Sequence, residues 1–347
     1  MKKILIVGNW AWDHCEEAFA NALRKQDFEV IPFKINLDKL PKPLKLIPLN
    51  PFLKSIQIQL LETVRVNKPN FVFLWNATHV TYETVFKMSK DNAKIVTYSN
   101  DDPYFNSNKP LRQKLLWRKF LQYINLADFH FVYRPINIAE SKKYTNAPTF
   151  LLPPYFIPEK FHNLKLSDQD LSKYETDVVF IGHYENDSRS DFLEFLHDKG
   201  IKIKLFGTGW NKNCSESFLK KFGNIARLNQ EDYFKSLKAS KICLSFLSKY
   251  NRDIYTRRCF EITGSGNLLL CERNEYMKSL FLENSEATYF SSKEELLEKI
   301  NWLNSNHEII RDISIAGNKK AYESGHSIDL RAKYFADLVT EKTDKSL

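Results

Sequence analysis

The alternation of short apolar strands with amphipathic helices is the feature that most constrains what this chain can fold into. Residues 3–8 (KILIVG) are an apolar run that ends at glycine, as in a strand buried on both faces of a parallel sheet. Residues 13–25 have apolar side chains at helical spacing. Further strands are predicted at residues 28–33, 70–75, 94–99 and 126–134. Because parallel strands need helical crossovers, this half predicts an open, doubly wound α/β sheet.

A proline-rich segment separates this half from a second one. Residues 148–158 contain four prolines, whose fixed φ angles favour an extended connector over a helix. The strand and helix rhythm then restarts, with strands predicted at residues 177–182, 201–207, 241–247 and 267–272. A length of 347 residues suits two domains of this kind.

These patterns predict the domain boundaries. A first Rossmann-like domain occupies residues 1–152, a linker residues 153–170, and a second Rossmann-like domain residues 171–328. A helix at residues 329–347 is expected to pack back on the first domain. Ligands of such sheets bind beyond the carboxyl ends of the strands, so we expect the site in a cleft between the two domains.

Composition narrows the functional class. Hydrophobic residues make up 43% of the chain and charged residues 27%, as in globular proteins, and no apolar run approaches the ~18 residues of a membrane-spanning helix. Five scattered cysteines without a C-x-x-C pair indicate neither a disulfide framework nor a zinc site, which favours the cytoplasm. The formal charge of +9 indicates an anionic partner, such as a nucleotide diphosphate, an anionic lipid or a nucleic acid.

Residues 251–272 concentrate charge at the start of a predicted helix. The free N–H groups of a helix N-terminus favour a diphosphate there, and Arg257 and Arg258 would add charge-assisted contacts. Glu261 would accept hydrogen bonds from ribose hydroxyls. The alternative is that Arg257 and Glu261 form an ordinary i,i+4 helix pair.

The same segment resembles a known family. Its T-x-R-x-F-E…G pattern resembles the signature of the CgeB-like branch of group 1 glycosyltransferases, and it is formed here by Thr256, Arg258, Phe260, Glu261 and Gly266. Asp253 and Glu261 resemble the paired acids of retaining GT-B enzymes, with Asp replacing the usual first Glu. The resemblance extends over about residues 177–335. It implies the GT-B architecture of two Rossmann-like domains facing across a cleft, with the acceptor on the side of the first domain and the nucleotide-sugar donor held by the second.

Residues 177–189 resemble the opening of that second domain. Gly182 would let the backbone approach a phosphate, and Arg189 would pair with it, although a plain strand-loop-helix is the alternative. The predicted donor-binding residues are therefore Gly182, Arg189, Asp253, Thr256, Arg257, Arg258, Glu261 and Gly266.

Candidate catalytic bases lie in the first half of the chain. Asp101 and Asp102 follow a predicted strand, and Asp13 and His14 follow the first one, so each could remove a proton from an acceptor hydroxyl. Asp-Asp-Pro is also good turn chemistry, and Asp13 is a reasonable helix N-cap. Tryptophans near strand ends are candidates for stacking on sugar rings or for packing in the cleft wall: Trp10, Trp12, Trp75 and Trp210.

Residues 109–123 contain five basic residues, no acids and an apolar stripe. Such a helix can lie on anionic lipid at the inner face of the membrane, bind a polyanionic acceptor, or pack in the core with a solvated basic side.

Together these features predict a hexosyltransferase-like glycosyltransferase. It would move a sugar from a nucleotide-diphosphate-sugar to a glycan, lipid-linked or protein acceptor, with retention of configuration and without a metal or another cofactor. One alternative is a sugar-nucleotide epimerase of the same shape. A basic nucleic-acid-binding protein is a weaker alternative, because no helix-turn-helix, RNA-recognition or zinc motif accompanies the basic residues.

Overall fold

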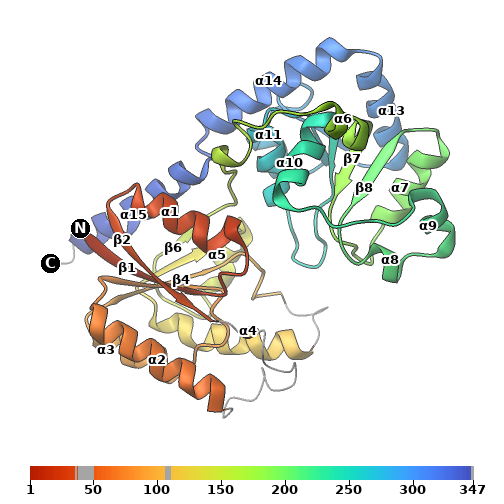
Figure 1. Ribbon diagram of the computed structural model, residues 1–347. Helices are drawn as coiled ribbons and strands as arrows, with labels where there is room; N and C mark the ends of the chain where they lie inside the picture. Colours follow the sequence, from red (N-terminus) through yellow and green to blue (C-terminus); the bar gives the residue numbers. More distant parts are fainter. Residues whose placement is uncertain (36, 38–50, 106–110, 345–347) are drawn as a thin grey trace. The chain divides into compact units, whose positions relative to one another are not determined.

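The computed structural model describes residues 1–35, 37, 51–105 and 111–344. The chain forms two compact units, which are treated separately below. Unit 1 comprises Met1–Pro154 and Ile328–Leu347, and unit 2 comprises Tyr155–Ser327 (Figure 1).

Unit 1 is built on a six-stranded parallel sheet with the order β2-β1-β3-β4-β5-β6. Its strands are β1 (Lys2–Gly8), β2 (Phe28–Lys34), β3 (Phe71–Trp75), β4 (Lys94–Ser99), β5 (Phe129–Val132) and β6 (Thr149–Leu151). The central strands β3 and β4 are buried along almost their whole length. Their continuous apolar runs are what a sheet covered on both faces requires.

Helices cover both faces of this sheet. On one face, α2 (Pro51–Asn67), α3 (Tyr82–Lys90) and α4 (Leu111–Tyr123) share an apolar core with β1, β3 and β4. The opposite face carries α1 (Ala18–Arg24) and α15 (Ile328–Asp344), while α5 (Pro135–Ser141) packs beside β5 and β6. Unit 1 is therefore doubly wound.

The C-terminal helix α15 belongs to unit 1. It runs beside α1, as the blue and red ribbons of Figure 1 show. Phe335 is fully buried, with its ring 4.8 Å from the rings of Phe73 and Phe131 and 5.5 Å from that of Phe19. The last helix thus supplies part of the core of the unit formed by the start of the chain.

Unit 2 contains a five-stranded parallel sheet with the order β11-β10-β9-β7-β8. Its strands are β7 (Thr176–Ile181), β8 (Ile203–Phe206), β9 (Ser240–Ser245), β10 (Leu269–Glu272) and β11 (Thr288–Phe290). The helices are α6 (Asp168–Tyr174), α7 (Arg189–Asp198), α8 (Trp210–Asn213), α9 (Glu216–Phe222), α10 (Gln230–Ala239), α11 (Arg257–Gly264), α12 (Glu275–Leu280), α13 (Lys293–Asn304) and α14 (His307–Glu323). Both units thus have the predicted α/β class.

Two local features differ from the sequence predictions. The helix predicted at residues 13–25 begins as a π-helical turn, η1 (Asp13–Glu17), with non-helical dihedrals at Cys15, and continues as α1. Residues 149–151, predicted as part of an extended connector, form the edge strand β6 beside β5. An edge strand has one unpaired side, so it tolerates the nearby prolines.

Residues 155–170, which the sequence placed in a linker, belong to unit 2. Phe156 is fully buried, its N–H bonds to the carbonyl of His326 at 3.1 Å, and its ring lies 4.8 Å from that of Tyr322. Aromatic side chains buried in this way tie the segment to α14 and its C-terminal end. The division of the chain therefore falls at Pro154 rather than over an eighteen-residue linker.

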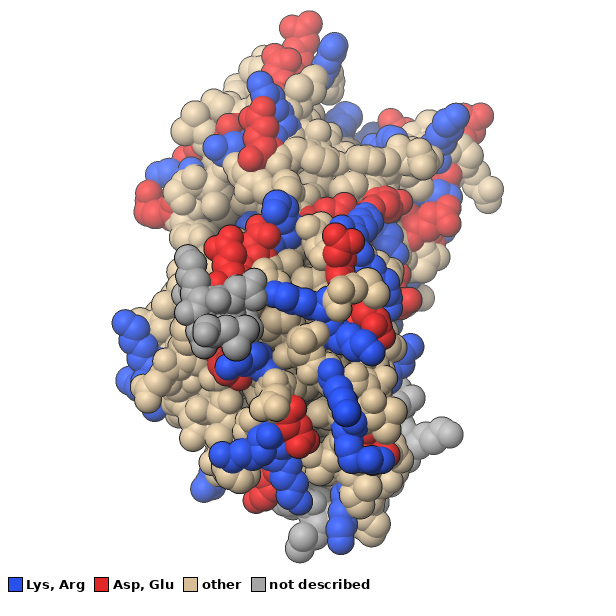
Figure 2. Space-filling view, turned by 90° about the vertical axis from the view of Figure 1, so that its left-hand side faces the viewer, with Lys and Arg blue, Asp and Glu red and all other residues tan. Residues whose placement is uncertain are grey.

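The basic segment at residues 109–123 largely corresponds to α4; residues 109 and 110 lie outside the described residues. Trp117 and Phe120 pack in the core, whereas Leu111 and Leu115 are exposed. Part of the predicted apolar stripe is therefore ordinary core packing, and part of it is exposed. Among the described residues, no helix is both long enough and apolar enough to cross a membrane. On the face in Figure 2, Lys and Arg side chains are interspersed with Asp and Glu side chains.

Candidate functional site

In unit 2, three adjacent strands end at one edge of the sheet and bring three polar segments together. Gly182–Arg189 follows β7, Phe246–Thr256 follows β9, and Glu272 ends β10. Parallel pairing puts these carboxyl ends side by side, where ligands of open α/β sheets bind. We refer to this place as the unit-2 edge.

Arg189 anchors the loop after β7. Its side chain is only 4% exposed, and its Nε and Nη2 donate to the two carboxylate oxygens of Asp187, each at 2.8 Å. Nη1 donates to the carbonyl of His183 at 3.0 Å, and Nη2 also pairs with Glu185 at 3.1 Å. The sequence had assigned Arg189 to a phosphate. Because four of its five N–H groups meet protein acceptors, its role in the structure is to hold residues 183–189 in place.

Glu185 connects the loop after β7 to the loop after β9. Its carboxylate accepts a hydrogen bond from Ser248 Oγ at 3.0 Å and pairs with His183 Nε2 at 2.9 Å. Burial acts to raise the pKa of Glu185, but the hydrogen bond from His183 and the charge of Arg189 outweigh it, so the pKa lies below its usual value. The two loops are thereby held together by an ionised group.

Arg258 lies at the unit-2 edge beside Gly182. A Cβ atom added to Gly182 would be 3.3 Å from Nη2 of Arg258 and 2.7 Å from the ring of Phe180. The guanidinium carbon of Arg258 is 5.6 Å from the centroid of the Phe180 ring. Its Nε is buried and has no hydrogen-bond partner among the described residues. The structure thus brings Gly182 and Arg258 together, far apart as they are in sequence, and leaves a cationic donor unsatisfied.

Glu261 lies one turn along α11 from Arg257 and is 8% exposed. Arg257 Nε pairs with its Oε1 at 2.9 Å, and the hydroxyl of Tyr233 on α10 donates to its Oε2 at 2.9 Å. The ordinary i,i+4 pair therefore forms. Each carboxylate oxygen can accept more than one hydrogen bond, so the pairing leaves capacity for ligand hydroxyls. Burial, and then the charge of Glu261, raises the pKa of Tyr233, which keeps that hydroxyl a donor.

Thr256 and Asp253 lie immediately before α11. Thr256 is the N-cap residue in extended conformation, and its side chain makes no capping hydrogen bond. Asp253 is half-buried, and its N–H bonds to the carbonyl of Ser248 at 2.9 Å. The Thr256 hydroxyl instead lies 3.7 Å from Cys259 Sγ. Because this hydroxyl does not cap the helix, the start of α11 retains N–H donors for an anion.

Gly266 does not lie at the unit-2 edge. It follows the end of α11 with φ +76°, and its N–H bonds to the carbonyl of Thr263 at 3.1 Å. The eight residues of α11 separate it from Arg257 by about 12 Å along the helix axis. Its left-handed conformation terminates the helix, so Gly266 acts as a structural stop at the opposite edge of the sheet.

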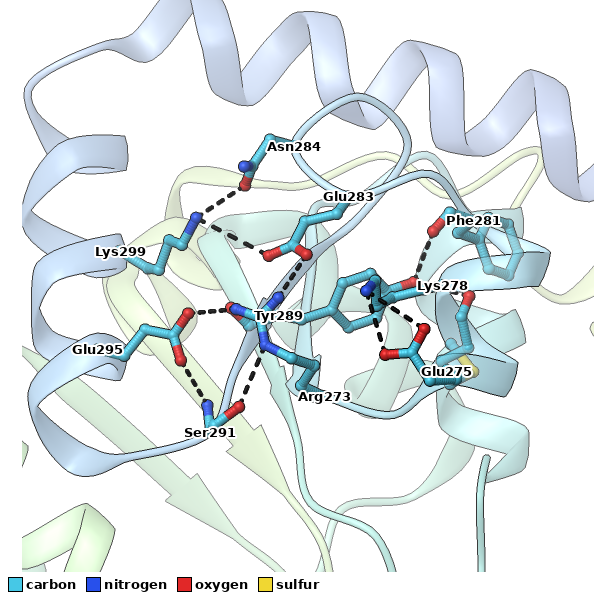
Figure 3. Close-up of polar contacts among 11 residues, drawn as sticks. Arg273, Glu275, Lys278, Phe281, Glu283, Asn284, Tyr289, Ser291, Glu295 and Lys299 are labelled. Atoms are coloured by element: carbon cyan, nitrogen blue, oxygen red, sulfur yellow. Dashed lines mark hydrogen bonds and ion pairs between the residues drawn. The ribbon is translucent and has the colours of Figure 1, made fainter.

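A network of charged side chains fixes the chain just after β10 (Figure 3). Arg273 pairs with Glu283 and Glu295, and its Nε donates to Ser291 Oγ at 3.1 Å. Tyr289 donates its hydroxyl to the carbonyls of Met277 and Phe281, at 2.9 and 2.8 Å. Next to this network, Glu272 accepts the N–H of Leu247. The network therefore stabilises the third segment of the unit-2 edge.

Unit 1 has a cavity of about 400 Å³ at the corresponding edge of its own sheet. It is lined from the ends of β1, β3 and β4, and includes Trp12, Glu16, Trp75, Asn76, Asn100 and Asp101. Glu16 is 4% exposed, and its Oε1 accepts the N–H of Asn9 at 3.0 Å. Burial raises the pKa of Glu16, although N–H groups of its own loop oppose the shift. A Cβ on Gly8 would lie 2.4 Å from that carboxylate oxygen, so a larger residue there would require the Glu16 side chain to shift.

The four candidate bases have different surroundings, and Asp101 is the one among them that lines the unit-1 cavity as described. Asp102 is fully buried, and its Oδ1 accepts hydrogen bonds from the N–H groups of Tyr104 and Phe105 and from Asn137 Nδ2. Asp102 thus fills the turn role that Asp-Asp-Pro allowed, and no longer suits a base. Asp13 and His14 pair with each other at 3.5 Å on η1, and neither is among the residues that line the cavity.

Trp210 is another residue whose predicted contact with a ligand is replaced by packing. It is fully buried and donates its Nε1–H to the carbonyl of Gly182 at 2.7 Å.

Sequence reasoning missed Glu16, Tyr233 and Glu185. Glu185 lies within the segment 177–189 that carries the resemblance, but its residue type was not singled out there. Contacts that only the fold creates bring Glu16 to Asn9 and Tyr233 to Glu261.

Comparisons with known proteins agree with this geometry. Residues 189–337, less than half of the chain, match a family model described as glycosyl transferase-like. No curated protein sequence matches the chain.

Solved structures resemble the whole chain. Sucrose-phosphate synthase from Thermosynechococcus elongatus superposes with a TM-score of 0.70 at 11% identity, covering 99% of this chain and 100% of that one. HepE from Anabaena in complex with UDP and glucose has a TM-score of 0.68 at 12% sequence identity, covering 98% of this chain and 100% of that one. A putative UDP-N-acetylglucosamine 2-epimerase from Listeria monocytogenes has a TM-score of 0.64 at 12% sequence identity, covering 99% of this chain and 98% of that one. The fold class is thus the GT-B architecture of two Rossmann-like units.

The surroundings of Arg189 give a prediction about stability. Replacing Arg189 with alanine would leave the carboxylates of Asp187 and Glu185 without their main counter-charge, so we expect a loss of about 3–5 kcal/mol in the free energy of unfolding of unit 2. Urea denaturation followed by circular dichroism measures this loss, with Arg311→Ala on the exposed side of α14 as the matched control. Unchanged stability together with weakened UDP binding would instead make Arg189 a phosphate ligand.

Proposed function

We propose that this protein is a glycosyltransferase that binds a nucleotide-diphosphate-sugar at the unit-2 edge. The observation that carries the proposal is the Arg258 guanidinium beside Gly182, with a buried Nε that meets no hydrogen-bond acceptor among the described residues. Arg258 lies at the start of α11, whose N-cap side chain makes no capping hydrogen bond. Fixed donors of this kind suit the charge that develops on a departing diphosphate. Glu261, oriented by Arg257 and Tyr233, would accept the ribose hydroxyls.

The comparisons support this choice of reaction. The glycosyl transferase-like family model covers the whole of α11 and begins at Arg189. The HepE structures contain UDP with glucose, or UDP-glucose. A similar structure, described as trehalose-6-phosphate from E. coli (TM-score 0.63), contains UDP-2-fluoro glucose. We therefore propose a UDP-sugar as the donor, and a glycan, lipid-linked or protein acceptor.

The second candidate is a sugar-nucleotide epimerase, which the likeness to the Listeria protein favours. An epimerase converts a sugar nucleotide without any acceptor, whereas a transferase needs one to form a glycoside. Incubation with each UDP-sugar in the absence of an acceptor separates them: a new UDP-sugar epimer in the product would replace our proposal with this one.

The role of Arg258 gives the first functional prediction. Arg258→Ala removes a preorganised cationic donor, so kcat/KM for donor turnover should fall by a factor that corresponds to about 2–4 kcal/mol. Release of UDP measures the effect, and Arg311→Ala is the control for loss of a positive charge. Normal turnover in the Arg258 variant would place the donor elsewhere.

We also propose that donor binding requires no metal ion, because the start of α11 and Arg258 supply the positive charge that the diphosphate needs. Turnover should then be unchanged by EDTA within experimental error. Activity that disappears in EDTA and returns with manganese would contradict this proposal.

Retention of configuration is the last part of the proposal, and it rests on the spacing of Asp253 and Glu261. In a retaining reaction the donor diphosphate can accept the proton of the acceptor, and no carboxylate of unit 1 is required as base. Asp101→Asn should therefore keep most of the turnover, and NMR of the product should show the anomeric configuration of the donor. An inverted product, with turnover lost in this variant, would make Asp101 the base.

A further inference from the structure

The unit-1 cavity carries an unsatisfied polar atom that points to a ligand. Asn76, at the end of β3, donates its side-chain amide to Oδ1 of Asn100 at 2.5 Å. Its own Oδ1 is buried and has no hydrogen-bond partner among the described residues. A buried carbonyl left without a donor is unfavourable, and a ligand hydroxyl would supply the missing hydrogen bond.

The backbone at Asn76 holds this amide in place. Its φ is +45°, in the left-handed region that asparagine tolerates better than most residues, and its N–H bonds to the carbonyl of Tyr98 at 2.9 Å. Strained backbone of this kind concentrates at ligand-binding sites. The backbone conformation and the hydrogen bond to Asn100 therefore hold the Asn76 amide in one orientation.

Aromatic and acidic groups complete the cavity. Trp12 is 47% exposed on its rim, whereas Trp75 is 3% exposed and packs against Tyr98 and Phe19. An exposed indole offers a flat apolar face, and the buried one makes a rigid wall. Glu16 and Asp101 add two carboxyl groups, and none of the described residues that line the cavity is Lys or Arg.

These observations define the chemistry of the occupant. Amide and carboxyl oxygens accept hydrogen bonds from hydroxyl groups, and an indole packs on the apolar face of a sugar ring. Glu16 and Asp101 are the acidic groups of the described lining, and His79 is its one titratable base, so a neutral ligand matches this lining better than an anionic one. The volume of about 400 Å³ lies within the range of roughly 300–1,000 Å³ of small-molecule sites.

We infer that the unit-1 cavity binds a neutral, hydroxyl-rich sugar ring, with Asn76 as a specificity-determining residue, and that it discriminates against phosphorylated and uronic sugars. The inference deepens the proposed function, on which it rests for the statement that this sugar is the acceptor. Trp12 stacks on the ring, and Asn76 Oδ1 accepts one of its hydroxyls.

Binding of small glycosides tests the inference without any turnover. The probes are the methyl glycosides of glucose, galactose, mannose and N-acetylglucosamine, with glucose 6-phosphate and methyl glucuronide as anionic counterparts, titrated in saturation-transfer NMR. We expect at least one neutral glycoside to bind, and its anionic counterpart to bind about tenfold more weakly or not at all.

Two variants locate that binding. Asn76→Gly keeps a residue that accepts positive φ and removes the amide, so affinity should fall about three- to tenfold. Its matched control is Asn92→Gly, at an exposed position of unit 1 with φ +61°. Trp12→Ala should weaken binding about tenfold, with Phe86→Ala, 43% exposed on α3, as the control.

The outcomes distinguish this inference from the proposed function. Failure of every neutral glycoside to bind, equal or tighter binding of the anionic ones, or unchanged affinity in both Asn76→Gly and Trp12→Ala would overturn it. Binding that Arg258→Ala weakens but Asn76→Gly does not would assign the sugar to unit 2 and also overturn it. Glycoside binding that Asn76→Gly weakens, in a protein that turns over no sugar nucleotide, would refute the proposed function while the cavity assignment stands.

Discussion

Parallel strand pairing is the constraint on which the rest of this structure depends. A parallel strand can pair with the next only after a crossover returns the chain to the starting edge, so all carboxyl ends lie at one edge of each sheet. In unit 2 this brings Gly182, Ser248 and Glu272 together, and in unit 1 it brings Gly8, Asn76 and Asn100 together. The polar segments that follow the strands thus become neighbours, although they lie far apart in sequence, as Gly8 and Asn100 do.

The unit-2 edge divides its charged residues between two roles. Arg189 neutralises Asp187 and Glu185 within the loop framework, so its removal would leave two largely buried carboxylates without this counter-charge. Arg258 lies at the edge beside Gly182, and within the described parts of the chain its Nε has no hydrogen-bond acceptor. The charged groups of the loop after β7 pair with one another, which makes that loop rigid. The start of α11 keeps positive charge that these pairs do not neutralise.

The two units present opposite chemistry at corresponding edges. Unit 2 offers an arginine and a helix start, which suit a diphosphate, while the described lining of the unit-1 cavity offers amides, indoles and carboxyl groups. One shared architecture can therefore serve two kinds of ligand, because the sheet fixes only where the loops lie and the loop residues decide what they bind.

The sequence by itself determined the α/β class, most strand positions and the segment around α11, because buried parallel strands are continuous apolar runs and the Arg-rich helix start is local. Only the tertiary structure decided which polar residues lie at the strand ends and which are held by protein groups. Arg189 is paired with a carboxylate of its own loop, and Asp102 accepts N–H groups of its own turn, so both side chains are buried. Gly266 lies at the far end of α11, because a helix advances about 1.5 Å per residue. Glu16, Tyr233 and Asn76 entered the sites through contacts between distant strands and helices, and no local pattern encodes such contacts.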